Sequence, residues 1–352
     1  MIDPTRLSRL PIAQAPMAGS SGPALTAAVT AAGGFGHLPG GYRAADALAA
    51  DIDALRALIG EAPFGVNLFL PHSAPTAAER ERVRRYARSL ERAAGRWGGA
   101  VGTPVPGTER DDWDAKLALL IEHPVPVVSF TFGLPDPTAI AALTDAGTLT
   151  VATVTTPEEA ALAADAGVGA LCVQGAEAGG HQGTFTNVDD PSPYGLLTLL
   201  TLVAAGTDLP LIAAGGIVTG AQIEAVLTAG ASSAQLGTAF LRCPESIASD
   251  THKDALADPA FERTVLTRAF SGRWARGLRN GFSARHEAEA PGVYPWVHHL
   301  VAPIRKAAAA AGEPDGVALW AGQGWRLARA EPAADVIDRL VDEMAAARKA
   351  HP

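Results

Sequence analysis

A chain of 352 residues with 48% hydrophobic and 18% charged residues can bury a large core and is too apolar to be disordered. Its formal net charge of -9, without a stripe rich in Lys and Arg, argues against a nucleic-acid partner. The basic run at 80–92 is interleaved with Glu81 and Glu91, a pattern typical of a solvated helix face.

The two cysteines, Cys172 and Cys243, lie in apolar stretches without CxxC spacing. This pattern favours reduced thiols in the core over a disulfide or a metal site. No N-terminal signal with a basic start and an apolar run precedes Pro11, and no uninterrupted apolar stretch reaches about 18 residues. We therefore expect a cytoplasmic protein without a membrane partner.

Short apolar runs alternate with Ala-rich helical stretches from Leu10 to about residue 241. This alternation predicts parallel strands separated by helices. The expected strands are 11–16, 34–38, 64–70, 125–132, 148–154, 170–173, 209–214 and 234–241. Eight such units in a chain of this length favour an α/β fold of the closed (β/α)8 TIM barrel type over an open doubly wound sheet.

The alternation is interrupted between the third and fourth strands. Residues 72–123 hold a charged helix, a connector rich in Gly and Pro, and a second helix, so we interpret them as a helical insertion. The barrel is expected to span residues 1–242. Residues 243–352 are expected to form a helical extension that caps the barrel mouth and ends in a helix at 333–349.

The stretch 169–183, GALCVQGAEAGGHQG, contains the main candidate for catalysis. Its apolar run stops at Gln174, and three glycines then precede His181. Glycines let the backbone approach a flat ligand closely, and they deliver this imidazole to the end of the strand. His181 is therefore our candidate catalytic base, and His37, which also follows a strand end, is the second choice.

The loops after the last two strands predict a phosphate site. Barrel ligands lie at the C-terminal strand ends, and phosphate is commonly held by these two loops. Gly215 and Gly216 follow the seventh strand, and residues 235–238 (QLGT) end the eighth. Their main-chain N–H groups can cradle a phosphomonoester, although the glycines can also simply shorten the turns. Neither GxxxxGK[ST] nor an early GxGxxG occurs, which disfavours ATP and a Rossmann dinucleotide.

Amide side chains at other strand ends suit a heteroaromatic ring. Asn67 and Gln174 can satisfy the polar edge of such a ring, and the alternative for each is a hydrogen bond to loop backbone. Met17 can lie against the ring or fill the core. His298 and His299 have no carboxylate at HExxH spacing, so no metal is expected.

Taken together, six segments resemble the nitronate monooxygenase family, formerly called 2-nitropropane dioxygenases, and its class I members in particular. The segments are PIAQAPMAG (11–19), FGVNLF (64–69), QGAEAGGHQG (174–183), LIAAGGI (211–217), AQLGTAFL (234–241) and FSGRWARGLRN (270–280). The resemblance implies an FMN-dependent (β/α)8 barrel with His181 as the active-site base. The residues expected to contact FMN are Ala15, Pro16, Met17, Ala18, Asn67, Gln174, Gly179, Gly180, Gly215, Gly216, Gln235, Leu236, Gly237 and Thr238.

Two further segments resemble family features. Residues 271–277 (SGRWARG) are expected to close over the cofactor, and residues 322–324 (GQG) accompany them. Tyr294 can approach the substrate, but packing is the favoured role for this side chain.

The resemblance implies oxidation of an alkyl nitronate, such as propionate 3-nitronate, by FMN and dioxygen to a carbonyl compound and nitrite. One alternative is a flavin-dependent NAD(P)H enoyl-ACP reductase, because EAGGH and AGGI look similar in such enzymes. Another is a non-catalytic flavin-binding barrel. The sequence leaves open the chain length of the substrate and the oligomeric state, for which a homodimer is one candidate.

Overall fold

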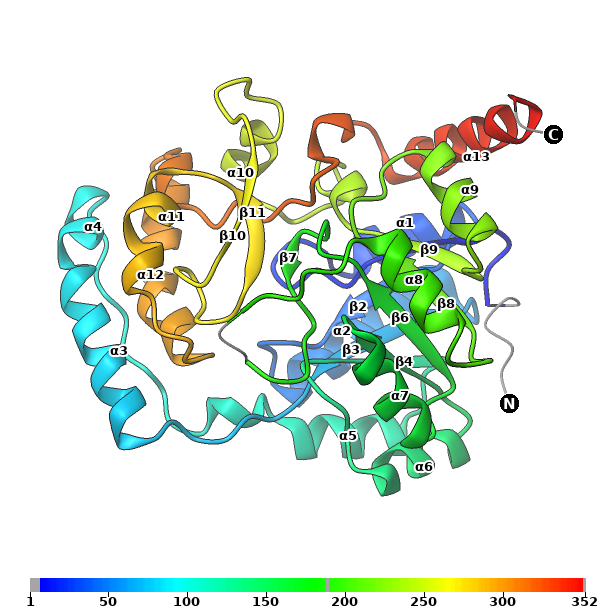
Figure 1. Cartoon of the computed structure of the whole chain (residues 1–352), viewed down its shortest axis with the longest axis horizontal. Helices are drawn as coiled ribbons and strands as arrows, with labels where there is room; N and C mark the ends of the chain where they lie inside the picture. The colour runs from blue at the N-terminus through cyan, green and yellow to red at the C-terminus, as the bar shows by residue number, and fades with distance from the viewer. Residues whose placement is uncertain (1–6, 188–189, 351–352) are drawn as a thin grey trace.

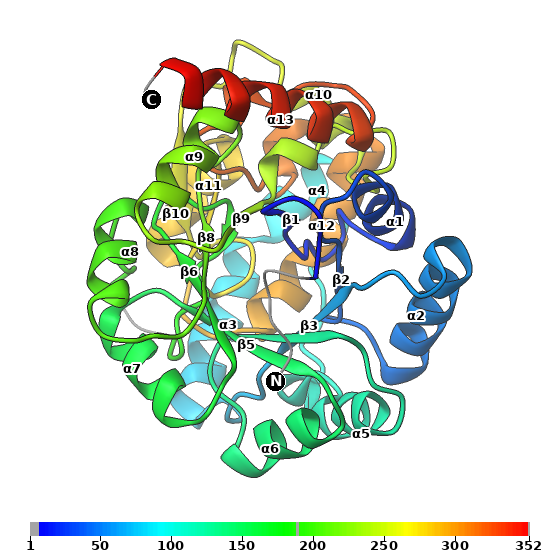
Figure 2. The ribbon, with the colours of Figure 1, turned by 90° about the vertical axis from the view of Figure 1, so that its right-hand side faces the viewer.

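A computed structural model describes residues 7–187 and 190–350. Eight parallel strands form a nearly closed barrel with helices around it (Figure 2), which confirms the predicted TIM-barrel class. The strands follow the order β1-β9-β8-β6-β5-β4-β3-β2. They are β1 (Ile12–Gln14), β2 (His37–Pro39), β3 (Gly65–Phe69), β4 (Val127–Thr131), β5 (Leu149–Val154), β6 (Ala170–Gln174), β8 (Leu211–Ala214) and β9 (Ser233–Leu236).

The barrel closes between its first two strands through Phe35. The N–H of Gln14 donates to the Phe35 carbonyl at 2.8 Å, and the N–H of Phe35 donates to the Ile12 carbonyl at 2.9 Å. The expected eighth strand is shorter than its apolar run, because the chain turns at Gly237 into the 3-10 helix η3 (Thr238–Phe240).

The outer layer consists of helices that cover the apolar outer face of the strands. Val66, Leu68 and Phe130 share one core cluster with helix side chains such as Leu48 and Leu120. Side chains alternate along a strand, so the residues between these face the barrel interior. The helices are α1 (Pro23–Ala31), α2 (Ala45–Ile59), α5 (Trp113–Glu122), α6 (Pro137–Asp145), α7 (Pro157–Asp165), α8 (Leu196–Ala204) and α9 (Gly220–Thr228).

The final helix completes this layer instead of capping the mouth. Helix α13 (Ala333–Ala350) packs against α9 and α1, as Figure 2 shows. Its apolar face, which includes Val336, Ile337 and Leu340, is fully buried in the same core as the outer face of the barrel. The expectation that all of 243–352 lies over the mouth is therefore wrong for α13.

The insertion and the remaining extension form a second core beside the barrel (Figure 1). Helix α3 (Ala77–Ser89) begins with a capping box at Thr76 and buries Val83 and Tyr86. This face packs on α12 (Trp296–Ala310), and the Tyr86 hydroxyl donates to the Ala269 carbonyl at 2.7 Å. The insertion thus packs with the extension. The other helices of this core are α4 (Glu91–Arg96) and α11 (Gly281–His286), whereas α10 (Asp250–Ala255) packs in a separate cluster of the extension.

Helix α5, at the end of the expected insertion, occupies a regular barrel position between α2 and α6. Of the expected insertion, only the residues between β3 and α5 therefore leave the barrel. No helix of the described chain is long and apolar enough to cross a membrane.

A small antiparallel sheet joins the extension to the barrel. Strand β10 (Thr264–Thr267) pairs with β11 (Ala275–Leu278), and β11 pairs with the two-residue strand β7 (Gly180–His181). In this second pairing Ala275 lies opposite His181. The extension thereby fixes the backbone of the candidate catalytic loop.

Candidate active site

A cavity of about 510 Å³ lies at the C-terminal ends of the barrel strands. This volume falls within the range of small-molecule and cofactor sites. The cavity brings together the candidate base His181 and most residues that the sequence assigned to a cofactor. These lining residues are Ala15, Pro16, Met17, Ala18, Asn67, Gln174, Gly179, Gly180, Gly215, Gly216, Gln235, Gly237 and Thr238.

Leu236 is the exception among the expected cofactor residues. Its side chain is buried in the core between the barrel and the helices and does not line the cavity. Alternation along β9 explains this, because Gln235 points inward and its neighbour must point outward.

His181 lies in the cavity wall on β7, and its Nε2 is 2.8 Å from the Oγ of Ser271. The Ser271 hydroxyl donates to the Arg273 carbonyl at 3.2 Å. Its oxygen is therefore the acceptor for Nε2–H of His181, an arrangement that leaves Nδ1 as the basic nitrogen. The rings of Phe132, Tyr294 and Trp320 surround the imidazole at centroid distances of 5.6, 5.9 and 5.7 Å.

These surroundings keep the imidazole neutral. Burial is the main cause that lowers the pKa of His181 to about 3, and the positive charges of Arg273 and Arg305 lower it further. At neutral pH the ring can accept a proton or a hydrogen bond. Positive charge near the ring comes from these two guanidinium groups, of which Arg305 also lines the cavity.

Gln174 holds the loop that carries His181. Its Nε2 donates to the His181 carbonyl at 3.1 Å, and its Oε1 accepts from the Gly183 N–H at 2.7 Å. The side chain therefore makes the loop-backbone bonds that were the alternative to a ring contact, although it also lines the cavity.

The segment 271–277 supports the same loop from outside the cavity. Ser271 contacts His181, and the Trp274 carbonyl accepts from the Gln182 N–H at 2.9 Å. None of these residues lines the cavity, so the expected closure over a cofactor is wrong. Of the GQG tripeptide, Gly322 and Gly324 do line it.

The glycine rim offers main-chain donors. The backbones of Gly215 and Gly216 have φ values of 120° and 71°, in the region that favours glycine. Within residues 7–187 and 190–350, no acceptor is in hydrogen-bond range of the N–H groups of Gly215, Gly216, Gly237 or Thr238. Because main-chain donors are normally paired, this group of four points to an anionic ligand.

Polar side chains line the barrel axis below this rim. The Asn67 Nδ2 donates to the hydroxyls of Ser129 and Thr131 at 3.0 and 2.9 Å. The expected partner was a ring edge or loop backbone, and for the amide nitrogen the hydroxyls of the neighbouring strand β4 take this place. Gln235 Nε2 lies 3.4 Å from the Sγ of Cys172, and burial raises the pKa of this thiol to about 12.

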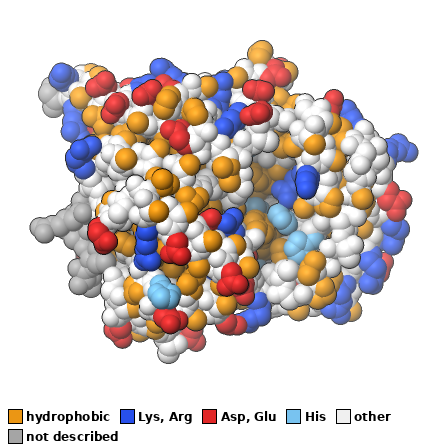
Figure 3. All heavy atoms as spheres, turned by 180° about the vertical axis from the view of Figure 1, so that it is seen from behind, with side chains coloured by type: hydrophobic (Ala, Val, Ile, Leu, Met, Phe, Trp, Pro, Cys, Tyr) orange, Lys and Arg blue, Asp and Glu red, His pale blue; other side chains and the backbone are white. Residues whose placement is uncertain are grey.

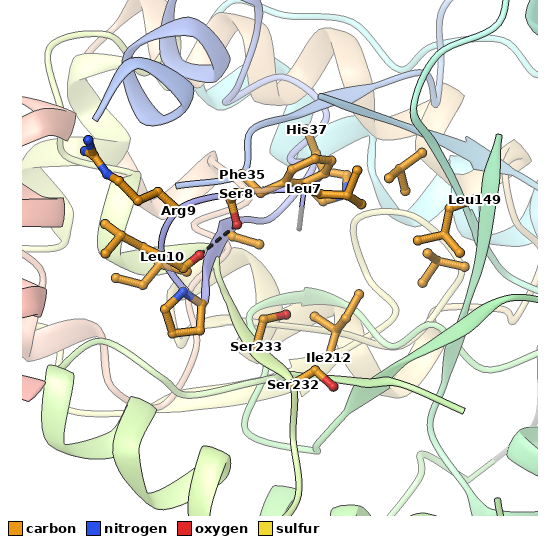
Figure 4. Close-up of a pocket in the computed structure, with 15 residues that line it drawn as sticks. Leu7, Ser8, Arg9, Leu10, Phe35, His37, Leu149, Ile212, Ser232 and Ser233 are labelled. Atoms are coloured by element: carbon orange, nitrogen blue, oxygen red, sulfur yellow. Dashed lines mark hydrogen bonds between the residues drawn. The ribbon is translucent and has the colours of Figure 1, made fainter. Parts of the chain in front are cut away.

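A second cavity of about 220 Å³ opens at the opposite end of the barrel (Figure 4). It contains His37, whose Nδ1 lies 3.1 Å from the Gln14 carbonyl. Burial lowers the pKa of His37 to about 4. His37 does not line the upper cavity, so its second-choice role as catalytic base is wrong. Strand β2 begins at His37, which places this side chain at the end of the barrel opposite the cavity.

Several cavity residues escaped the sequence analysis, among them Tyr42, Arg305 and Trp320. His298, considered there only as a metal ligand, stacks on Tyr42 with ring centroids 4.2 Å apart. A signal existed, because Tyr42 follows β2 and because His298 and Arg305 are seven residues apart on one helix face. In the face shown in Figure 3, histidine side chains lie beside basic side chains at a hollow.

The remaining candidates have structural roles. Glu177 accepts from the N–H of Leu196 at 3.0 Å and so caps α8. Tyr294 is buried and does not line the cavity, which confirms packing as its role. Among the described residues no group of three or more His, Cys, Asp and Glu side chains could hold a metal ion.

Comparison with known proteins gives a consistent result. The family model described as nitronate monooxygenase matches residues 5–343. A nitronate monooxygenase of Pseudomonas aeruginosa is 41% identical over 95% of this chain and 96% of its own length. A crystallised nitroalkane oxidase from Streptomyces ansochromogenes is 52% identical, covers 99% of both chains and gives a TM-score of 0.95. FabK from Thermotoga maritima is 26% identical with a TM-score of 0.76, covering 98% of this chain and 96% of its own. The chain belongs to the nitronate monooxygenase family.

Proposed function

We propose that this protein oxidises alkyl nitronates with FMN and dioxygen, releasing a carbonyl compound and nitrite. The observation that carries the proposal is the cavity itself. In this cavity, unpaired main-chain N–H groups at the ends of the last two strands lie together with the neutral, hydrogen-bonded imidazole of His181. The names of the relatives, nitronate monooxygenase and nitroalkane oxidase, support this reaction class.

The residues present fit FMN. The N–H groups of Gly215, Gly216, Gly237 and Thr238 would hold its phosphate, because they lack other acceptors among the described residues. A side chain at Gly216 would lie 2.9 Å from the Cβ of Glu177, so the rim accepts no larger residue there. Asn67 and Gln235 offer amide groups to the polar edge of a ring. When bound, the flavin would supply electron transfer between substrate and dioxygen.

His181 would act on the substrate directly. Its Nδ1 can take the α-proton of a neutral nitroalkane, or the ring can hold a preformed nitronate in place. A pKa near 3 makes the imidazole a weak base, which favours the nitronate as substrate. An anion bound beside the ring would also raise this pKa, because it offsets the charges of Arg273 and Arg305. Phe132 and Trp320 form apolar walls that limit water access.

The second candidate function is an NAD(P)H-dependent enoyl reductase, because the EAGGH and AGGI segments also look similar in such enzymes. A non-catalytic flavin-binding barrel is the third. Anaerobic mixing of the FMN-loaded protein separates them by flavin absorbance. Reduction by propyl nitronate supports the proposal, reduction by NADPH supports the reductase, and reduction by neither supports the non-catalytic barrel.

Aerobic turnover of propyl and propionate nitronates, with and without NADPH, tests the proposal. We expect nitrite release without NADPH. His181→Asn should lower kcat/KM for a neutral nitroalkane by about 100-fold, the usual contribution of a general base. Equal consumption of the nitroalkane by variant and parent would show that His181 is not the base.

A further inference from the structure

The upper cavity contains an unbalanced positive charge. Its lining includes two arginines, Arg43 and Arg305, and no Asp or Glu. Arg43 is neutralised by Asp51, with Nη2 and Oδ2 2.6 Å apart. Arg305 has no carboxylate within 4.0 Å anywhere in the described parts of the chain.

Arg305 is held in place by neutral groups. It lies on α12, where its Nη2 is 3.1 Å from the Nδ1 of His298. His298 is neutral, because burial and then the nearby Arg305 charge hold its pKa far below the ordinary value, so Nδ1 can accept from the guanidinium. The stack of His298 on Tyr42, with rings 9° from parallel, fixes the orientation of this acceptor.

The guanidinium also has an N–H donor that makes no hydrogen bond with the described part of the chain. The Nε of Arg305 is buried and has no hydrogen-bond partner among the described residues. A charged group that loses hydration without gaining a counter-ion is costly, and burial accordingly lowers the pKa of Arg305. A planar anion with two oxygen atoms matches the fork of N–H donors and would offset this cost.

The guanidinium of Arg305 shares the cavity with the candidate base. The Arg305 charge acts on His181, which lines the same chamber. The unpaired main-chain donors assigned to a phosphate come from different elements, the loops after β8 and β9. The guanidinium of Arg305 and these main-chain donors therefore come from separate elements of the cavity wall.

We propose that Arg305 is the specificity-determining residue that recognises the negative charge of the substrate, with His298 and Tyr42 as its positioning residues. The inference rests on the proposed function and deepens it. A nitronate in the cavity that Arg305 lines would gain an ion pair with the guanidinium, whereas a neutral nitroalkane would gain none.

The test compares Arg305→Met and Arg305→Lys with Lys306→Met. Methionine keeps the unbranched stem of the side chain and removes the charge, and lysine keeps the charge and removes the fork. Lys306 is the next residue on α12, is exposed and does not line the cavity, so its substitution matches the change in net charge. Circular dichroism and FMN content establish that each variant folds and loads.

Two readouts are needed. The first is calorimetric binding of nitrate, a planar anion that mimics a nitronate head group but cannot react. The second is the KM for propyl nitronate against the KM for neutral nitropropane. For Arg305→Met we expect both the nitrate Kd and the nitronate KM to rise about 10- to 100-fold, with a change below about threefold for nitropropane. Arg305→Lys should lie between Arg305→Met and the parent, and Lys306→Met should match the parent.

Equal nitronate KM and nitrate Kd in Arg305→Met and the parent would overturn the inference while leaving the oxidation of nitronates intact. If the parent oxidised no nitronate but nitrate binding depended on Arg305, the proposed reaction would fail and the anion site would stand. Should Arg305→Met not fold, Arg305→Lys decides: an unchanged nitrate Kd and nitronate KM in that variant contradict recognition by the fork.

Discussion

The Oγ of Ser271 lies 2.8 Å from the Nε2 of His181 and joins the extension to the candidate base. Ser271→Ala removes the acceptor for Nε2–H, so the imidazole loses its fixed tautomer. We expect kcat/KM to fall about 10-fold, equivalent to one hydrogen bond. The acid limb of the pH profile should move to lower pH, because the lost acceptor stabilised the protonated ring.

Ser283→Ala is the matched control for this prediction. Ser283 is also buried and hydrogen-bonded in the extension, but its partner is Asn280. Both variants should lose similar stability in urea. A pH profile of Ser271→Ala that overlays the parent would rule out a positioning role.

Gly216→Ala tests the cofactor rim. Alanine is strained at a φ of 71°, and its Cβ would lie 2.9 Å from the Cβ of Glu177. We expect FMN affinity, measured by quenching of flavin fluorescence, to fall at least 10-fold. Gly95→Ala in α4 is the control, because a Cβ there meets no atom within 4 Å. Equal FMN binding by Gly216→Ala and the parent would contradict a cradle at this glycine.

Acid sensitivity should follow from buried neutral histidines. Burial lowers the pKa of His37 and His252 to about 4, from 6.5. Because the unfolded chain binds the extra protons first, stability is lost as the pH falls from 6.5 towards 4. Each residue contributes a slope of about 1.4 kcal/mol per pH unit in this window.

The measurement is the free energy of unfolding in urea between pH 7 and pH 5. His252→Gln keeps a donor for the Trp320 carbonyl, which lies 2.9 Å from Nε2 in the parent, and removes the titration. We expect the slope of the free energy of unfolding against pH to decrease by about 1.4 kcal/mol per pH unit, which corresponds to one proton. An unchanged slope would mean that His252 titrates normally in the folded state.

The second core predicts a separate stability effect. Leu90 is fully buried between α3 and α4 and packs in the cluster shared with α12. Leu90→Ala should lower the free energy of unfolding by about 2 to 5 kcal/mol. Leu58, which is 63% exposed on α2, gives the control, because Leu58→Ala should change stability by about 0.5 kcal/mol or less. Similar losses for the two variants would contradict a shared core.

The local pattern of the sequence was sufficient to predict the barrel and one side of the site. Strand ends such as Gln174 and Ala214 are marked by the glycines that follow them, and the fold rule places all C-terminal ends at one mouth. Residues anchored to those ends, including His181 and Gly216, were therefore found in the cavity.

The missed features depend on long-range packing. Arg305 enters the cavity from a helix far along the chain. Its seven-residue spacing from His298 indicates a shared helix face, but the sequence does not indicate that this face of α12 lies over the barrel mouth. The position of α13 was missed for the same reason, since its amphipathic pattern fits either a cap or an outer helix. Alternation on β9 alone would have placed Leu236 outside the cavity.

The position of α13 affects how the protein can fold during synthesis. Its partners α1 and α9 are made long before it, so their apolar surfaces around Val29 and Val226 stay uncovered until α13 has been made. A chain stalled before residue 333 would leave these apolar side chains exposed to chaperones and proteases. Helix α13 therefore covers this apolar surface late in synthesis, after all the barrel strands have been made.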